Sequence, residues 1–180
     1  MTTSSEDLGA ALRDHHERIE QMMATVKTTS GDDRRAVFRR LRRFLAAHEA
    51  AERIFIHLLV EHDPVQDDIA ERRVREEDEA GEVLAELEDI DVDSGEFDRI
   101  FDQLSHSVSK HARAEELQEL PAVIEQCRSA DIDRIRLALE HVDVVVSHRG
   151  GPLGEGDRSF AQLLEAAKVE FRALRNDLDG

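Results

Sequence analysis

The chain has neither tryptophan nor tyrosine, and its 180 residues include a single cysteine and three prolines. One cysteine excludes both an internal disulfide and a thiolate zinc cluster, so we expect Cys127 to be a small buried side chain. No apolar run approaches the ~20 residues that a membrane-spanning helix needs. The first ten residues lack the basic start and the apolar segment of a secretory signal. We therefore expect a soluble cytoplasmic protein that binds no membrane.

Positive charge is also scarce, because acidic residues outnumber lysine and arginine by 41 to 24 and give a formal net charge of −17 at pH 7. A protein that binds nucleic acid needs a basic surface against the phosphates, so we expect no nucleic-acid partner. The chain is nevertheless long enough to bury the core of one domain.

Apolar residues recur with a helical period along most of the chain, and the period-two alternation that marks strands is absent. The pattern predicts an all-α protein whose first two thirds hold four long helices, at about residues 5–26, 33–61, 65–88 and 96–120. Short connections between these helices favour an up-down-up-down four-helix bundle at residues 5–125.

The last third, residues 126–180, is predicted to be a helical extension. Two helices, at about 131–146 and 159–178, flank a glycine-rich loop at residues 149–156. We expect the extension to pack on the bundle as a flap, and the competing interpretation is a contact for a partner protein. The pattern is compatible with a monomer and with a homodimer formed through the apolar face of the last helix.

Two predicted helices carry a histidine four residues before a glutamate inside their apolar stripes: His48 with Glu52, and His111 with Glu115. Residues four apart lie on one face of a helix, so an imidazole and a carboxylate at this spacing can bind one metal ion together. A single pair is equally well explained as a buried ion pair. Two pairs favour a metal site, because burying such groups without partners is strongly unfavourable.

The other two helices of the predicted bundle also place ligand-capable side chains near their middles. These are His15 and His16 in the first helix and Asp78 in the third. In an up-down bundle the middles of the four helices meet at one level, where carboxylate-bridged di-iron sites are built. Histidine with carboxylate suits iron, manganese or zinc. The sequence therefore predicts one shared metal site rather than two separate ones.

The sequence resembles the hemerythrin-like (HHE cation-binding) family over about residues 5–125. The matching segments are Leu12-Arg-Asp-His-His-Glu-Arg-Ile19, His48-Glu-Ala-Ala-Glu52 and His111-Ala-Arg-Ala-Glu115. The family places a leucine four residues before its first histidine and an aliphatic residue three after it. That register selects His16, and it leaves His15 as a supporting neighbour or an alternative ligand.

The resemblance implies a four-helix bundle that holds two non-heme irons. It assigns Glu52 and Glu115 as bridging ligands, and His16, His48 and His111 as terminal ligands.

The third helix departs from the family pattern, which supplies one or two histidines there. Residues 65–88 contain none, and Asp78 stands where the histidine is expected. We expect Asp78 to bind metal through oxygen, with Glu77 as the less favoured substitute.

A carboxylate in place of an imidazole is a harder, negatively charged donor, and it stabilises Fe(III) over Fe(II). The sequence therefore predicts an iron protein that reacts with or senses O2, peroxide or NO, with redox chemistry or sensing favoured over reversible oxygen transport. Catalase- or peroxidase-like activity and sensing in oxidative stress both stay open. Two other functions compete: metal binding or iron storage without turnover, and a metal-free bundle that acts as an interaction module.

Overall fold

The all-α class is confirmed in a computed structural model that describes residues 3–57, 64–147, 153 and 158–179. None of these residues forms a strand. The α-helices are α1 (Thr3–Thr28), α2 (Gly31–Glu52), α4 (Pro64–Glu88), α5 (Gly95–Ala114), α6 (Leu120–Gln126), α7 (Ser129–Ser147) and α8 (Phe160–Asp179). Two π-helical segments, η1 (Arg53–His57) and η2 (Glu115–Glu119), continue α2 and α5.

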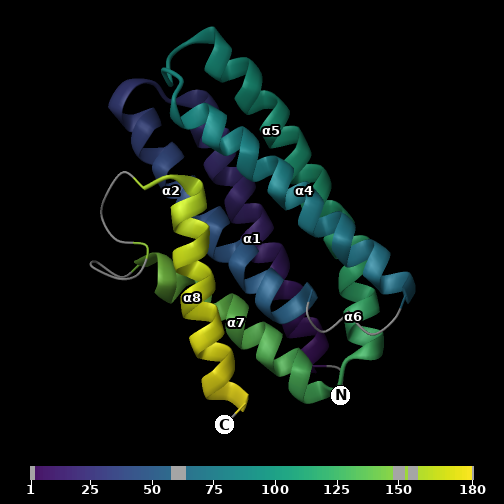
Figure 1. Cartoon of the computed structure of the whole chain (residues 1–180). Helices are drawn as coiled ribbons and strands as arrows, with labels where there is room; N and C mark the ends of the chain where they lie inside the picture. The colour runs from purple at the N-terminus through teal and green to yellow at the C-terminus, as the bar shows by residue number, and fades with distance from the viewer. Residues whose placement is uncertain (1–2, 58–63, 148–152, 154–157, 180) are drawn as a thin grey trace.

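Helices far apart in the sequence lie side by side (Figure 1). The α4 and α5 helices form a long pair, and α1 contacts both α2 and α5. The C-terminal helices α7 and α8 lie against α2, and α7 also contacts α1. The last third of the chain therefore packs directly on α1, which carries His16, and on α2, which carries His48 and Glu52.

The second half of α2 is surrounded by other helices. Every residue from Phe44 to Glu52 is buried, which a helix with neighbours on one side alone would not show. Four alanines in this stretch give it a narrow profile that lets α1, α7 and α8 approach: Ala46, Ala47, Ala50 and Ala51. The polar side chains on this part of α2 are consequently removed from water.

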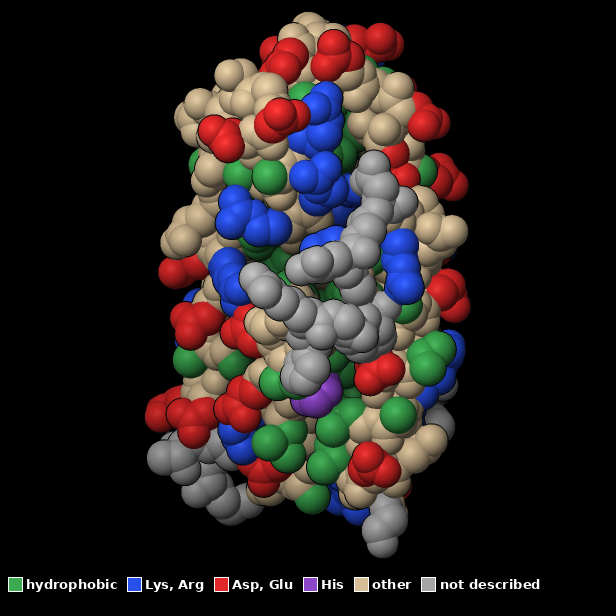
Figure 2. Space-filling model, turned by 90° about the vertical axis from the view of Figure 1, so that its left-hand side faces the viewer, with side chains coloured by type: hydrophobic (Ala, Val, Ile, Leu, Met, Phe, Trp, Pro, Cys, Tyr) green, Lys and Arg blue, Asp and Glu red, His purple; other side chains and the backbone are tan. Residues whose placement is uncertain are grey.

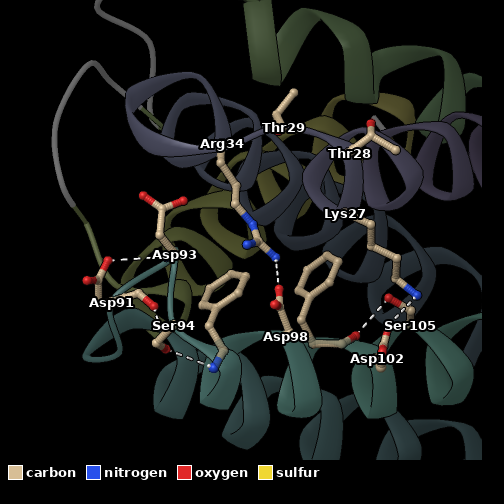
Figure 3. Close-up of polar contacts among 12 residues, drawn as sticks. Lys27, Thr28, Thr29, Arg34, Asp91, Asp93, Ser94, Asp98, Asp102 and Ser105 are labelled. Carbon is tan, nitrogen blue, oxygen red and sulfur yellow. Dashed lines mark hydrogen bonds and ion pairs between the residues drawn. The ribbon is translucent and has the colours of Figure 1, made fainter.

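Polar contacts join the turn before α2 to the turn before α5 (Figure 3). Gly31 opens α2 with a φ of 58°, a conformation that favours glycine, and its N–H donates to the Asp93 carboxylate at 2.9 Å. Arg34 pairs with Asp98 across the same gap. Ser94 caps α5, because its side-chain oxygen accepts from the Phe97 N–H at 3.1 Å. These contacts fix how α1 and α2 sit relative to α4 and α5.

The predicted helix boundaries differ from the structure at three places. Pro64 lies between the predicted helices at 33–61 and 65–88, and in the structure it is the first residue of α4, where its missing N–H costs nothing. The predicted helices at 33–61 and 96–120 are interrupted by η1 and η2. Residues 58–63 and most of the predicted loop 149–156 lie outside the described residues.

The surface is acidic, yet six arginines lie between residues 34 and 43 of α2. Figure 2 shows Lys and Arg side chains gathered in the upper half of one face, with Asp and Glu around them. Among the described residues, no helix is long and apolar enough to cross a membrane.

Candidate metal site

His48, Glu52 and Glu115 are buried and His111 is half-buried, and the two His-x-x-x-Glu pairs face each other across the core. His48 Nε2 lies 3.3 Å from Glu52 Oε1, and His111 Nε2 lies 3.1 Å from Glu115 Oε1. The second oxygen of Glu115 lies 3.2 Å from His16 Nε2. Glu115 therefore joins α1 to the end of α5, and one carboxylate stands between two imidazoles.

These side chains form two overlapping groups, each with four potential ligand atoms within 4.8 Å of one another. We call them the first position (His16, His48, Glu52 and Glu115) and the second position (Glu52, Glu77, His111 and Glu115). Glu52 and Glu115 belong to both groups. A carboxylate has two oxygens, so each of these residues can reach two neighbouring cations at once.

Unsatisfied polar atoms in this cluster fit a bound cation. Both carboxylate oxygens of Glu52, Glu115 Oε2 and His16 Nε2 are buried, and none has the geometry of a hydrogen bond with a residue that the structure describes. The short distances from His16 to Glu115 and from His48 to Glu52 are ion-pair contacts without that geometry. Buried polar atoms are normally hydrogen-bonded, and buried charges are normally paired or bind metals. A metal ion between the imidazoles and the carboxylates would satisfy all four atoms.

Helix α4 contributes Glu77 rather than Asp78. Glu77 is 2% exposed and belongs to the second position, whereas the side chain of Asp78 is 59% exposed and lies in neither group. Asp78 instead accepts a hydrogen bond from Arg53 Nη2 at 2.8 Å, and Arg53 Nε also pairs with Glu77. Asp78, which the sequence favoured on this helix, therefore lies one residue away from Glu77, which joins the cluster.

Sequence pattern could have identified Glu77. The buried face of α4 steps back from Leu84 to Ala80 and then to Glu77 and Arg73. Leu84 and Glu77 are seven residues apart, which brings them to the same face after two turns. The apolar stripe is thin here because charged residues fill most of residues 71–79, and that is why the face was misread.

In each imidazole of the cluster, Nε2 faces the other ligand candidates and Nδ1 contacts a side chain outside the two groups. His16 Nδ1 lies 2.7 Å from Glu116 Oε1, and His111 Nδ1 lies 3.0 Å from Glu76 Oε2. His48 Nδ1 lies 3.4 Å from His15 Nδ1.

Outer partners of this kind orient metal-binding histidines. The structure therefore places His16 in the cluster and His15 behind His48. The sequence interpretation missed Glu76 and Glu116, because acidic residues at half-exposed helix positions are too common to single out.

Burial and neighbouring charges shift the pKa values of the cluster, so that some side chains are in the metal-binding protonation state and others keep a proton. Burial lowers the pKa of His48 well below its usual value, and the neighbouring His16 lowers it further, so this imidazole is neutral. Burial alone would raise the pKa of Glu115, but His111 and His16 hold it well below its usual value.

Two further groups keep a proton in the metal-free site. Burial raises the pKa of Glu52 well above its usual value, and the carboxylates of Glu115 and Glu77 add to the shift. Burial opposes the charge of His111, yet Glu115, Glu77 and Glu76 raise its pKa to about 9. A cation at the second position must displace the His111 proton, because only the neutral imidazole binds metal.

A cavity of about 270 Å³ opens beside the two groups. Polar residues of the cluster form one wall, and apolar residues of α4 and α5 form much of the rest, among them Ala80, Val83, Leu104 and Val108. Glu49 also lines it, and Glu49 Oε2 is buried without a hydrogen bond to any described residue. The volume holds several water-sized molecules, so a diatomic gas or a peroxide fits.

The family model described as the hemerythrin HHE cation binding domain matches residues 7–123. No curated protein and no solved structure matches the chain.

Proposed function

Because the chain belongs to the hemerythrin HHE cation-binding domain family, we propose that it is a non-heme iron protein with two metal positions inside an up-down four-helix bundle. The four helices of the bundle are α1, α2, α4 and α5, the last continued by η2. The observation that carries the proposal is the sharing of Glu52 and Glu115 by two buried ligand groups.

Cation binding explains the cluster better than ion pairing does. The two positions together bring three carboxylates and three imidazoles into one site, and all of them but the half-buried His111 are buried. The free-energy cost of removing such groups from water is offset only when every group has a well-placed partner. Here four atoms form no hydrogen bond with the described residues. Two divalent cations would balance the carboxylates and use those atoms.

We assign the side chains as follows. Glu52 and Glu115 would hold both metals, and Glu77 would take the place that we expected for Asp78 from the sequence. His16 and His48 complete the first position, and His111 completes the second. The two π-helical segments begin at Glu115 and directly after Glu52, as expected for functional sites, where π-bulges are frequent.

Bound iron would supply one-electron chemistry toward a small ligand such as O2, peroxide or NO. The cavity beside the cluster admits such a ligand, and apolar side chains form part of its wall. Burial and the nearby Glu77 raise the pKa of Glu49 well above its usual value, so this wall carries a protonated carboxyl group. The carboxylate-rich ligand set favours redox chemistry or sensing over reversible oxygen carriage.

Iron loading tests the proposal. Purified protein loaded with Fe(II) without air and then desalted should retain about two irons per chain, one for each ligand group. Exposure to air should produce near-ultraviolet charge-transfer absorption. Protein that retains no iron and stays transparent contradicts the proposal and favours a metal-free interaction module. Iron retention without consumption of added peroxide indicates storage.

A pair of variants on one helix provides the control. His111→Ala should lose iron while keeping the helical circular dichroism signal, because it removes a ligand of the second position. His106→Ala, an exposed histidine on the same helix, should bind as much iron as the unmodified protein. Equal iron contents in the two variants would contradict the assignment of His111.

A further inference from the structure

We propose that the cavity beside the two ligand groups binds an organic hydroperoxide, a small molecule with a neutral O–OH head and an apolar body. This inference rests on the proposed function and names the class of peroxide that the site takes. The position, the size and the charge of the cavity support it.

Apolar side chains line the cavity on one side of the ligand candidates. On each of four helices, an apolar lining residue lies three residues from a ligand candidate, which is about one turn. It follows the candidate on α1 and α4 and precedes it on α2 and α5. Because successive helices of an up-down bundle run in opposite directions, these residues all lie toward the same end of the bundle. They are Ile19, Leu45, Ala80 and Val108.

The space on the other side of the cluster is nearly closed. Leu12, four residues before His16, and Ile56, four residues after Glu52, line a gap of about 10 Å³ there. The cavity on the first side measures about 270 Å³. A ligand larger than a diatomic molecule therefore has room in the cavity and not in the gap.

The cavity is larger than a diatomic gas or hydrogen peroxide requires. A water molecule occupies about 30 Å³ of the liquid, and an apolar cavity of about 150 Å³ binds benzene. An aromatic ring or a branched alkyl group can therefore lie against Val83 and Leu104 while the polar head of the same molecule reaches the cluster. Removal of that apolar body from water favours binding, a gain that hydrogen peroxide cannot provide.

The charge at the rim of the cavity favours a neutral head. The rim carries three exposed or half-buried carboxylates and one ammonium group, from Glu20, Glu76, Glu79 and Lys110. A ligand with a carboxylate head meets an excess of like charge there, which weakens binding. A hydroperoxide head is uncharged, and its O–H group can both donate and accept hydrogen bonds.

Binding of an unreactive analogue tests the inference without any measurement of activity. Cumyl alcohol has the body of cumene hydroperoxide, with a hydroxyl group in place of the hydroperoxyl group. Titrated into the metal-free full chain, it should cause saturable shifts in the methyl NMR signals of Ile19, Leu45 and Val83. The methyl signals of Leu8, which lines the gap, should not move. Benzoate, a ring with an anionic head, should bind about tenfold more weakly.

Two alanine variants on α4 provide a matched comparison. Ala80→Leu puts a larger side chain into the cavity wall and should weaken the binding of cumyl alcohol by about tenfold. Ala85→Leu makes the same change at an exposed position that does not line the cavity. It should bind the alcohol as tightly as the unmodified protein. Circular dichroism checks that both variants are folded.

The outcomes separate the inference from the proposed function. Absent or non-saturable shifts overturn the inference, and so do equal affinities in Ala80→Leu and Ala85→Leu. Benzoate that binds as tightly as the alcohol overturns the assignment of a neutral hydroperoxide head. Iron content should stay at about two per chain in both variants, because neither alanine belongs to a ligand group. A chain that binds the alcohol but retains no iron overturns the proposed function itself.

Discussion

At the scale of single residues, the sequence predicted the metal-ligand candidates on every helix of the site except α4. The spacing of histidine and glutamate singled out His48, Glu52, His111 and Glu115, and the family resemblance added His16. The structure gathers these five residues. The sequence interpretation failed on α4, where Glu77 rather than Asp78 faces the cluster. Charged side chains on both faces of that helix hide its buried side, and in the sequence only the seven-residue spacing from Leu84 favours Glu77 over the adjacent acid.

The raised pKa of His111 gives the metal-free protein a defined pH response. Its pKa rises from 6.5 to about 9 in the folded state, so protonated His111 stabilises the fold fully below pH 6.5. That contribution is lost as the pH rises through about 9. We expect His111→Gln to be less stable than the unmodified protein at pH 6, with the difference shrinking by pH 9.5 (about half a unit above the folded pKa).

Urea denaturation of the two metal-free proteins at several pH values measures this difference. A gap in stability that stays constant from pH 6 to pH 9.5 would mean that His111 gains nothing from its acidic neighbours, against the assigned geometry. The same proton predicts that metal binding at the second position tightens as the pH rises, because fewer chains carry it.

At the scale of elements, periodicity predicted which segments are helical but not where their hydrogen bonding changes. The α1, α4, α7 and α8 helices lie close to their predicted ranges. The π-helical segments η1 and η2 were not foreseen, because over five residues the helical period of apolar side chains does not distinguish a π-helical turn from an α-helical one. In η1, the carbonyl of Ile54 accepts a hydrogen bond from Arg175 of α8 at 3.3 Å. Tertiary contacts of this kind support η1, and the local sequence does not reveal them.

Helix α8 is an integral part of the fold around η1. Phe171 is fully buried between Phe55 of η1 and His141 of α7, with ring centroids 6.5 and 6.0 Å away. Phe171→Ala should lower the free energy of unfolding by about 3–5 kcal/mol, because it leaves a cavity. Val169→Ala, on the exposed side of the same helix, should change it by less than about 0.5 kcal/mol. Equal small effects in thermal or urea denaturation would mean that α8 is only loosely attached.

The cap at Ser94 makes a smaller and separate contribution. Its side chain satisfies one of the free N–H groups at the start of α5. Ser94→Ala should destabilise the protein by about 1 kcal/mol, and Ser94→Asp, which can also accept that bond, should retain most of the stability. If both variants lose the same amount in urea denaturation, the cap hydrogen bond is not the cause.

At the scale of the whole molecule, composition predicted the class and left the arrangement open. The scarcity of proline and the helical period led to an all-α protein, which the structure confirms for the described residues. Composition could not show that α7 and α8 surround α2. With α1 and the other helices also around it, the second half of α2 is buried on all sides. The C-terminal third thus covers α2, the helix that carries His48 and Glu52.

The central claim is that Glu52 and Glu115 hold two metals side by side. X-ray absorption at the iron edge of iron-loaded protein tests it most directly. The shared carboxylates predict a second metal at about 3.5–4 Å from each iron, together with nitrogen and oxygen ligands. Glu115→Ala should abolish that metal–metal signal. A spectrum of the unmodified, fully loaded protein with nitrogen and oxygen ligands alone, and no metal neighbour, would contradict the account.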